Sequence, residues 1–282
     1  MDINVTSPKF VRELMDTYGI APLKKFGQNF LIDGNVADKI AAAAAVDGEC
    51  ALEIGPGLGA LTSRLVQKAH HVAAYEIDAG LVRAISGILS DADNFTLFHK
   101  DFLKADLAKE LGPLFDGRDI YVAANLPYYI TSPCIMRLVT AKLNIKRITV
   151  MLQKEVAQRI CASSGGKEYG SISAAVQYFA RPELLFTVSP TCFYPKPDVH
   201  SAVMTLHVQP CDTAKAAEYL ETVRAVFAMR RKTVLSNLRQ GYDLPREQAQ
   251  AVLKAANIAE NARAETLSVK KLMRLSDEIH KK

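Results

Sequence analysis

The sequence has no apolar run long enough to cross a membrane. Its longest strongly apolar run is Ile40–Val46, far short of the ~20 residues that a bilayer-spanning helix needs. The first fourteen residues include Asp2, Lys9, Arg12 and Glu13, and they lack the apolar centre of a secretory signal. These absences predict a cytoplasmic protein with no membrane partner.

Metal and disulfide chemistry have equally little support in the sequence. The six histidines form no HExxH-type cluster, and no two cysteines form a CxxC pair. An odd number of scattered cysteines is typical of a reduced, intracellular protein; they are Cys50, Cys134, Cys161, Cys192 and Cys211. We therefore expect no disulfide framework, no metal ion and no metal-dependent hydrolysis.

The net charge of +5 is too small to identify a partner, but its distribution is informative. Residues 220–282 contain 13 Lys and Arg against 7 Asp and Glu, so the rest of the chain is close to neutral. A basic C-terminal quarter beside a neutral body favours an anionic partner such as nucleic acid. A solvated, Lys-rich helical surface would have the same composition.

The pattern of apolar residues predicts an α/β fold. Strands alternate with helices along this part of the chain. We expect the strands at Cys50–Ile54, His71–Ile77, Phe95–His99, Ile120–Ala124 and Arg147–Leu152. We expect the helices at Gly34–Val46, from Gly59 to about Ala69, from Asp78 to Leu89 and from Ser132. Repeated units of this kind predict a mostly parallel, doubly wound, Rossmann-like sheet. Leu184–Val188 and Ala202–Val208 flank a Pro-rich loop, and we expect them to form an antiparallel hairpin that closes the sheet.

The 282 residues are enough for about two domains. Gln209–Thr213 has the composition of a linker. Beyond it, Ala214–Lys282 is predicted to be helical throughout, with breaks near Gly241–Pro245 and Asn257–Asn261. We therefore divide the chain into an α/β domain, residues 1–208, and a small all-α domain, residues 209–282.

A glycine-rich loop follows the first expected strand directly. Gly55, Gly57 and Gly59 lie between that strand and the next helix, at the sheet edge where nucleotide-like ligands bind because the backbone must approach them closely. The loop suits NAD, FAD or S-adenosylmethionine, and a tight turn without a ligand would have the same sequence.

Two acidic residues end the next two strands. Glu76, with Ile77 after it, lies 21 residues beyond Gly55, where a carboxylate accepts hydrogen bonds from both ribose hydroxyls of an adenosyl cofactor. Asp101 lies where a carboxylate would accept from the exocyclic amine of the cofactor adenine, with Phe102 against the ring. An acidic residue at a strand end is also a common helix cap or turn residue.

The tetrapeptide Asn125-Leu126-Pro127-Tyr128 ends the fourth strand and favours methylation of an exocyclic amine over hydride transfer. The Asn125 side-chain oxygen and the Leu126 carbonyl would accept the two N–H groups of an adenine amine and turn its lone pair toward a methyl donor. Pro127 fixes the turn. Tyr128 would stack on a base taken out of its helix, where stacking worth roughly 1–3 kcal/mol is comparable to the cost of extrusion.

The chain resembles the rRNA adenine N6-dimethyltransferases, most closely the bacterial small-subunit (16S) type linked to kasugamycin sensitivity. The resemblance covers about residues 24–275 and rests on seven stretches in the same order: Lys24-Lys25-Phe26-Gly27-Gln28-Asn29-Phe30-Leu31, Glu53-Ile54-Gly55-Pro56-Gly57-Leu58-Gly59, Asn125-Leu126-Pro127-Tyr128, Met151-Leu152-Gln153-Lys154-Glu155-Val156-Ala157, Phe193-x-Pro195-x-Pro197, Arg230-Arg231-Lys232-Thr233 and Arg263-Ala264-Glu265-Thr266-Leu267-Ser268.

The resemblance implies roles for particular residues and a reaction. Asn29 and Leu31 would line an S-adenosylmethionine pocket together with the residues already singled out, namely Gly55, Gly57, Glu76, Ile77, Asp101, Phe102 and Asn125. Tyr128 and Phe193 would face the flipped adenine. The family dimethylates two adjacent adenines in the 3'-terminal hairpin of 16S rRNA within an assembling small ribosomal subunit. The chain departs from the family at Asp198 and His200, where the loop usually reads Pro-Lys-Val-Asp-Ser, and this changes the charge pattern near the target base.

The expected RNA contacts are basic: Lys24 and Lys25 near the N-terminus, and the consecutive Arg230, Arg231 and Lys232 in the C-terminal helices. A consecutive triplet does not share one helical face, so about two of its three side chains would face an RNA backbone. Arg224 and Arg239 lie nearby in the C-terminal helices. If about five phosphates are neutralised, the log–log dependence of binding on salt would have a slope of about −3.5 to −4.5.

Three rival functions remain open at this point. A 23S rRNA methylase of the antibiotic-resistance type shares the Gln28–Leu31 and Asn125–Tyr128 patterns, although the Gly55-Pro56-Gly57 loop and the Met151–Glu155 stretch favour the small-subunit type. A ribosome-assembly factor would depend on binding more than on catalysis. A nicotinamide oxidoreductase would share only the glycine loop. We expect a monomer, because nothing in the sequence demands a dimer.

Overall fold

The computed structural model describes residues 5–20 and 28–281. The chain divides into two compact units. The first consists of the residues up to Ala157 together with Pro182–Val208, and the second consists of Gln158–Arg181 and Gln209–Lys282. The functional division predicted at residue 208, into a catalytic part and an RNA-contacting part, stays a prediction.

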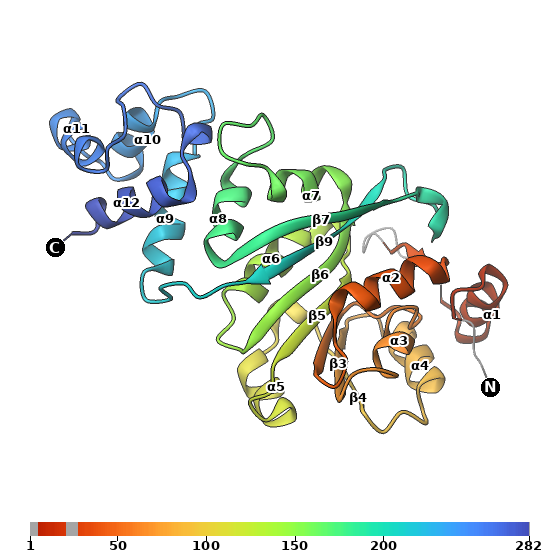
Figure 1. Cartoon of the computed structure of the whole chain (residues 1–282). Coiled ribbons are helices and arrows are strands. Elements are labelled where there is room, and N and C mark those ends of the chain that lie inside the picture. The colour runs from red at the N-terminus through yellow and green to blue at the C-terminus, as the bar shows by residue number, and fades with distance from the viewer. Residues whose placement is uncertain (1–4, 21–27, 282) are drawn as a thin grey trace. The chain divides into compact units, whose positions relative to one another are not determined.

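A seven-stranded sheet forms the centre of the first unit (Figure 1). Its spatial order is β4 (Phe95–His99), β3 (His71–Glu76), β2 (Cys50–Ile54), β5 (Ile120–Asn125), β6 (Ile145–Gln153), β9 (Ser201–Val208) and β7 (Ala180–Val188). The five strands from β4 to β6 are parallel, and β9 pairs antiparallel with β6 from Arg147↔His207 to Gln153↔Ser201. The predicted α/β fold class, a mostly parallel Rossmann-like sheet with a C-terminal antiparallel hairpin, is confirmed.

Three helices of the first unit begin at aspartate caps, and the helices that follow the parallel strands bury apolar residues. The unit contains α2 (Gly34–Ala44), α3 (Thr62–Leu65), α4 (Ala79–Ile88), α5 (Leu107–Phe115) and α6 (Thr131–Val139), and α7 (Lys154–Cys161) follows β6. Asp33 and Asp78 each accept hydrogen bonds from main-chain N–H groups in the first turn of the helix that follows. Helix α3 ends at Leu65, four residues before the predicted end near Ala69.

Two features of this unit were absent from the prediction. Helix α1 (Pro8–Tyr18) buries Val11, Leu14 and Met15 in a cluster with Phe30 and Leu81. A two-stranded sheet pairs β1 (Phe30–Leu31) with β8 (Phe193–Tyr194). Together these contacts hold the segment around Phe30 beside the carboxyl edge of the large sheet.

The second unit is helical, as predicted for the C-terminal residues. Its helices are α8 (Ser171–Phe179), α9 (Ala216–Val226), α10 (Val234–Gly241), α11 (Arg246–Ala255) and α12 (Val269–Ile279). The rings of Tyr178 and Tyr219 stack at 4.2 Å, and the Tyr219 hydroxyl donates to the Ala174 carbonyl at 3.0 Å. None of the helices described is long and apolar enough to cross a membrane.

The prediction of uninterrupted helix between Ala214 and Gly241 is wrong. Helix α9 ends at Val226 and α10 begins at Val234. The Asn237 side-chain amide donates to the main-chain oxygens of Val226 at 2.5 Å and Met229 at 3.3 Å. These bonds satisfy carbonyls that a continuous helix would use itself. The basic triplet Arg230–Lys232 therefore lies in a turn between helices.

Candidate functional site

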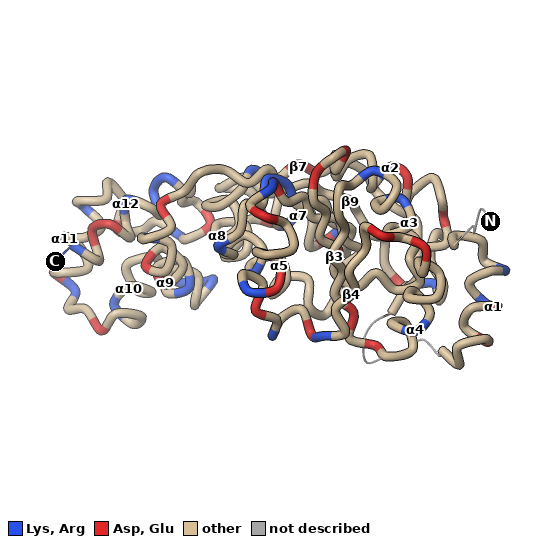
Figure 2. The backbone as a smooth tube through the Cα atoms, turned by 90° about the horizontal axis from the view of Figure 1, so that it is seen from below, with Lys and Arg blue, Asp and Glu red and all other residues tan. Residues whose placement is uncertain are grey.

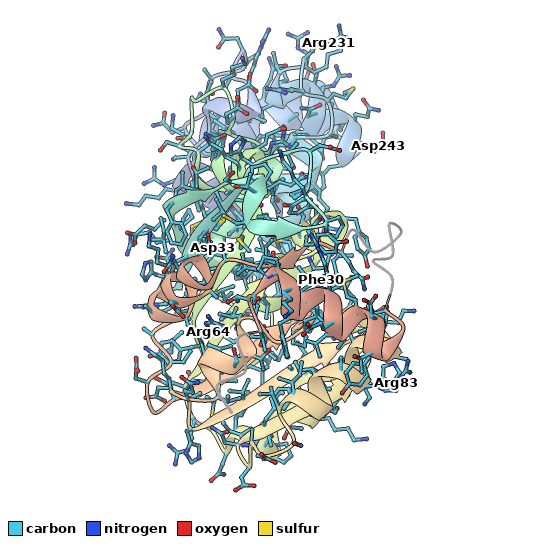
Figure 3. The ribbon with its side chains drawn as sticks, turned by 90° about the vertical axis from the view of Figure 1, so that its right-hand side faces the viewer. Phe30, Asp33, Arg64, Arg83, Arg231 and Asp243 are labelled. Atoms are coloured by element: carbon cyan, nitrogen blue, oxygen red, sulfur yellow. The ribbon has the colours of Figure 1, made fainter. Side chains whose placement is uncertain are left out.

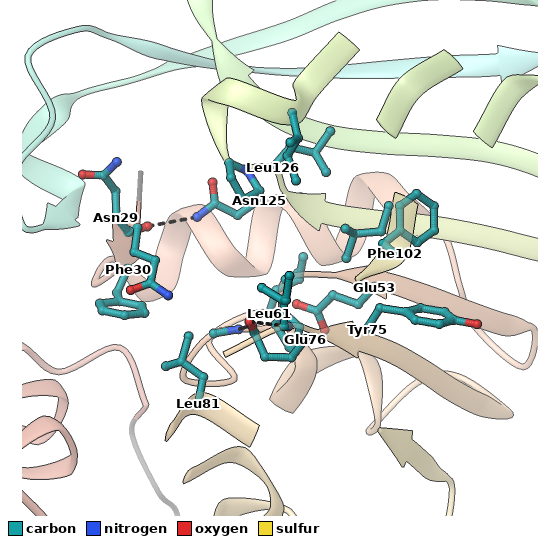
Figure 4. A pocket seen from close by; sticks show the side chains of 18 of the residues that line it. Asn29, Phe30, Glu53, Leu61, Tyr75, Glu76, Leu81, Phe102, Asn125 and Leu126 are labelled. Atoms are coloured by element: carbon teal, nitrogen blue, oxygen red, sulfur yellow. Dashed lines mark hydrogen bonds between the residues drawn. The ribbon is translucent and has the colours of Figure 1, made fainter. Parts of the chain in front are cut away.

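A pocket of about 310 Å³ lies at the carboxyl ends of β2, β3, β4 and β5 (Figure 4). Every residue predicted to bind a cofactor lines it: Asn29, Leu31, Gly55, Gly57, Glu76, Ile77, Asp101, Phe102 and Asn125. Leu126, Pro127 and Tyr128 line it as well. Parallel strands end at one edge of a sheet, which is why residues far apart in the sequence meet here.

The glycine loop forms one wall of the pocket in a backbone conformation that suits only glycine. Gly55, Gly57 and Gly59 have φ of 67°, 59° and 82°, in the left-handed region that L side chains rarely adopt. A Cβ at Gly57 would also lie 3.4 Å from Cδ1 of Phe30. The loop thus presents main-chain atoms to the pocket and leaves little room for side chains.

Glu76 joins the glycine loop to the end of β3. The residue is only 5% exposed. Its carboxylate accepts hydrogen bonds from the N–H groups of Ile77 at 2.9 Å, Asp78 at 3.0 Å and Gly57 at 3.3 Å. Burial raises the pKa of Glu76, and these three bonds offset part of that rise. Two carboxylate oxygens offer about four acceptor positions, so the group retains capacity for a hydroxyl donor.

Asp101 and Phe102 shape the neighbouring part of the pocket. The Asp101 carboxylate caps the short 3-10 helix Phe102–Lys104 by accepting from the Leu103 N–H at 2.9 Å. It therefore has the helix-cap role that the sequence left open, and it also lines the pocket. The ring of Phe102 is held edge-on by Tyr75 at 5.7 Å and lies 5.8 Å from the guanidinium of Arg137.

Asn125 is oriented by a hydrogen bond that joins distant parts of the chain. Its Nδ2 donates to the main-chain oxygen of Asn29 at 3.2 Å (Figure 4). Since the amide nitrogen is held there, the side-chain oxygen points away from Asn29. Asn125, which lines the pocket, thus carries an oriented side-chain oxygen that can accept a hydrogen bond.

Two tyrosines follow Asn125 and differ in their environments. The Tyr128 hydroxyl lies 2.7 Å from Oγ of Ser201, and burial raises the pKa of Tyr128. Tyr129 also lines the pocket, yet it is 54% exposed. Burial raises the pKa of Tyr129, and the carboxylates of Asp101 and Glu76 contribute to the rise. Tyr129 therefore lies at the rim on the side of these two carboxylates.

The structure does not bring every predicted residue to the pocket. Phe193 is 3% exposed, pairs with Leu31 through β8 and β1, and lies in the apolar core rather than on the pocket wall. Lys24 and Lys25 lie outside the described residues. The roles predicted for all three residues stay predictions.

The basic triplet belongs to the second unit. Arg230, Arg231 and Lys232 are exposed in the turn after α9, and Arg230 donates to the Lys167 carbonyl at 3.2 Å. The Arg231 side chain extends away from the ribbon of its own unit (Figure 3). In the rest of both units Lys and Arg are interspersed with Asp and Glu (Figure 2). The triplet differs because its three basic residues are consecutive in the sequence.

One pocket residue was quoted in the sequence motifs without being given a role. Glu53 is the fourth of the five residues of β2, with Ile54 between it and the glycine loop, and it lines the pocket. The signal in the sequence was an acidic residue in an expected strand whose other members are apolar. Charged residues are almost never fully buried unless they are paired.

The lining is acidic. Among the described residues that line the pocket, the charged side chains are Glu53, Glu76, Asp101 and Lys100. The Nζ of Lys100 lies 2.9 Å from Oε1 of Glu110, so its charge is already matched. Even with the Glu53 carboxyl protonated near neutral pH, Glu76 and Asp101 beside a compensated lysine favour a cationic ligand.

Comparison with known proteins gives a consistent result. The family model described as ribosomal RNA adenine dimethylase matches residues 23–281. The ribosomal RNA small subunit methyltransferase A of Geobacillus sp. (strain WCH70) is 43% identical, with 98% of each chain covered. The crystal structure of a dimethyladenosine transferase from Plasmodium falciparum has a TM-score of 0.72 at 25% identity and covers 87% of this chain and 95% of that one.

The 23S rRNA methyltransferase ErmE is also similar, with a TM-score of 0.68 at 25% identity over 90% of this chain and 100% of that one. Identity to the small-subunit relative is clearly higher than identity to ErmE. A family model that matches nearly the whole sequence, on a fold whose carboxyl edge carries the expected pocket, establishes the resemblance: the chain belongs to the ribosomal RNA adenine dimethylase family.

Proposed function

We propose that the protein transfers methyl groups from S-adenosylmethionine to N6 of two adjacent adenines, dimethylating each, in the 3'-terminal hairpin of 16S rRNA. The observation that carries the proposal is the oriented Asn125 amide, followed by Leu126-Pro127-Tyr128, on the wall of an acidic pocket. The 43% identity to a small-subunit methyltransferase supports the 16S target over 23S rRNA. The substrate is the assembling small subunit, and the protein acts on it as a monomer in the cytoplasm.

The pocket residues fit an adenosyl cofactor. Glu76 offers acceptor capacity for ribose hydroxyls, and Asp101 and Phe102 offer a carboxylate and a ring for the adenine. The left-handed glycines leave space that a Cβ would fill. Ile77 extends this surface at the rim, and Asn29 and Leu31 close the side formed by β1. The acidic lining also matches a cofactor that carries positive charge.

The remaining chemistry belongs to the target amine. Bound S-adenosylmethionine supplies an electrophilic methyl group on a sulfonium. An adenine amine is a poor nucleophile, because its lone pair is delocalised into the ring. The Asn125 oxygen and the Leu126 carbonyl accept its two N–H groups and direct the lone pair outward, while Tyr128 stacks on the base. No general base is needed, since the amine proton becomes strongly acidic once the nitrogen has gained the methyl group.

The RNA is held by residues outside this pocket. We assign phosphate contacts to Lys24, Lys25, Arg230, Arg231 and Lys232, and a supporting role near the target base to Phe193. Phosphate contacts fix position without reading sequence, so target choice depends on the shape of the rRNA. The charge change at Asp198 and His200 leaves Phe193 and Ser201 in place.

Transfer of labelled methyl groups to three substrates tests the proposal. Unmethylated small subunits, large-subunit rRNA and generic DNA would be incubated with labelled S-adenosylmethionine, and the products digested and identified by mass spectrometry. We expect dimethyladenosine from small subunits alone. Label in large-subunit rRNA would move the protein to the resistance type, and cofactor binding without any transfer would favour an assembly factor.

The Asn125→Ala variant separates catalysis from assembly. It removes the oriented oxygen, so methyl transfer should fall while binding to the subunit persists. If cells that carry only this variant mature their small subunits normally, binding is the more important activity of the protein.

A further inference from the structure

Arg137, in the last turn of α6, contacts the part of the chain that follows Asp101. Its guanidinium lies 5.8 Å from the centre of the Phe102 ring, and Phe102 lines the pocket (Figure 4). Its Nη2 donates to the main-chain oxygen of Ala105, which directly follows the 3-10 helix Phe102–Lys104. One side chain thus contacts both ends of this short helix. Arg137 is not among the described residues that line the pocket, so it supports the wall from behind.

The position of the guanidinium costs stability. The Nε of Arg137 is inaccessible to solvent and has no hydrogen-bond partner among the described residues. Buried N–H groups are nearly always paired, and an unpaired one is destabilising. A methionine, which has a similar length, would fill the space without a buried donor. Packing alone therefore does not account for an arginine here, and its charge and its Nη2 contact are both directed at the segment from Phe102 to Ala105.

The surroundings of the Phe102 ring strengthen its contact with Arg137. Phe102 is only 4% exposed, and Tyr75 packs edge-on against its ring at 5.7 Å. The nearby Asp101 carboxylate is paired with Nζ of Lys104 at 3.8 Å, which leaves the guanidinium charge directed at the ring. A cation over a desolvated ring is held more strongly than one in water. The ring is therefore fixed by Tyr75 together with Arg137.

The helix that carries Arg137 is anchored at its other end to the turn that ends β5. The Thr131 hydroxyl, in the first turn of α6, donates to the Pro127 carbonyl at 3.2 Å. A side chain on an anchored helix holds a site more precisely than one on a loop. Through Arg137, α6 therefore holds the Phe102 segment in a fixed place relative to the turn at Pro127.

We propose that Arg137 is a positioning residue for the adenine of the cofactor. It holds the Phe102 ring and the 3-10 helix in the conformation that binds the base. This inference rests on the proposed function, which makes S-adenosylmethionine the ligand and places its adenine beside Asp101 and Phe102. Arg137 itself contacts neither the cofactor nor the target amine. Its loss should weaken cofactor binding and leave the methyl-transfer step unchanged.

Calorimetry with S-adenosylhomocysteine tests the proposal. Arg137→Met removes the charge and the donors but keeps the length of the side chain, and it should weaken binding roughly 3- to 30-fold, as for loss of a desolvated cation–π contact. Arg137→Lys keeps a cation over the ring and should recover much of the affinity. Arg147→Met is the matched control, because Arg147 is also half-buried and donates to a main-chain oxygen, that of Ala43 at 3.2 Å, outside the pocket lining. It should leave the affinity unchanged.

A double-mutant cycle with Phe102→Leu separates positioning from a general loss of structure. If Arg137 acts through the ring, Arg137→Met should weaken binding in the native protein and have a clearly smaller effect in the Phe102→Leu protein. A purely structural effect would weaken binding by the same factor in both. Urea denaturation of each variant without ligand shows that it is folded.

Single-turnover methyl transfer to unmethylated small subunits provides a second readout. With Arg137→Met, the concentration of S-adenosylmethionine that gives half the maximal rate should rise in proportion to the loss of affinity. The rate at saturating cofactor should stay that of the native protein, because the Asn125 side chain and the Leu126 carbonyl are untouched.

Several outcomes would overturn the proposal. Unchanged affinity of Arg137→Met for S-adenosylhomocysteine would refute the positioning role and leave the proposed function standing. Equal losses with and without the Phe102 ring would make Arg137 a structural residue. A lower rate at saturating cofactor with unchanged affinity would assign Arg137 to the turn at Pro127 instead. If the native protein does not bind S-adenosylhomocysteine, the cofactor in the proposed function is wrong and the positioning role falls with it.

Discussion

The stability of the ligand-free protein should depend on pH through Glu53, and Glu53→Gln should remove that dependence. Burial raises the pKa of Glu53 from its ordinary value of 4.5 to about 8 in the folded protein. The folded state therefore holds a proton that the unfolded chain releases above pH 4.5. The stabilisation from this proton is fully present below pH 4.5 and is lost as the pH rises toward 8.

The size of the effect follows from linkage. Between about pH 5 and pH 8 the contribution of Glu53 to the free energy of unfolding should fall by about 1.4 kcal/mol per pH unit. Across the whole window this amounts to roughly 5 kcal/mol, a large share of the 5–15 kcal/mol by which proteins are typically stable. Glutamine has nearly the same shape and does not titrate. Glu53→Gln should thus be increasingly more stable than the native protein as the pH rises.

Urea denaturation of both proteins at pH 5.5, 6.5 and 7.5 measures this difference. Histidines and other carboxylates titrate in both proteins, so their contributions cancel when the two free energies are subtracted at each pH. The comparison requires equal m-values, which indicate that the same surface is exposed on unfolding. A difference that stays constant across the three pH values would refute the buried, protonated state of Glu53.

Three further predictions concern the pocket and the RNA surface. Gly57→Ala should weaken binding of S-adenosylhomocysteine about tenfold, because a φ of 59° costs an L side chain roughly 1–2 kcal/mol and the new Cβ would lie 3.4 Å from Phe30. Gly117→Ala is the control, because Gly117 has a φ of 71° and no atom within 4 Å of a built Cβ. It should lower the melting temperature about as much as Gly57→Ala does and leave the affinity unchanged. Tyr128→Phe should retain most of the single-turnover methyl-transfer rate, whereas Tyr128→Ala should lose about 10- to 100-fold because the stacking ring is removed. Equal losses in the two variants would assign the contribution of Tyr128 to its hydroxyl, which contacts Ser201. Replacing both Arg230 and Arg231 by Ala should reduce the magnitude of the salt slope of subunit binding by about 1.5 and leave cofactor affinity unchanged in calorimetry; unchanged subunit affinity at moderate salt would exclude a phosphate contact.

The sheet and its pocket could be predicted because their signals are local. Strands β2 and β4 lie where the sequence placed them, since short runs rich in apolar residues and bounded by turn residues are typical of strands. Asp78 was predicted to begin a helix, and it caps α4 with bonds to Gly80 and Leu81. Once the strand order is parallel, the residues at the strand ends have to meet at one edge.

The parts that were missed depend on contacts between distant residues. The pairing of Phe30 with Tyr194 joins two-residue strands that are far apart in the sequence, and segments so short have no periodicity to detect. The break before α10 depends on Asn237, which reaches back to the carbonyls of Val226 and Met229. Thr233 at the cap of α10 was the local signal, because its side chain accepts from the Ser236 N–H.

Glu53 shows why a residue that conflicts with its surroundings is informative. Strand β2 is buried along its whole length, with Ala51 and Leu52 inaccessible to solvent, so local packing favours an apolar side chain at position 53. The carboxyl group lowers the stability of the protein near neutral pH, because burial raises its pKa by more than the Thr62 hydroxyl lowers it. Sequences that fold well are consistent at every level except where function requires otherwise. If Glu53→Gln stabilises the protein increasingly from pH 5.5 to pH 7.5, the buried carboxyl accounts for the stability that the native protein loses over this range.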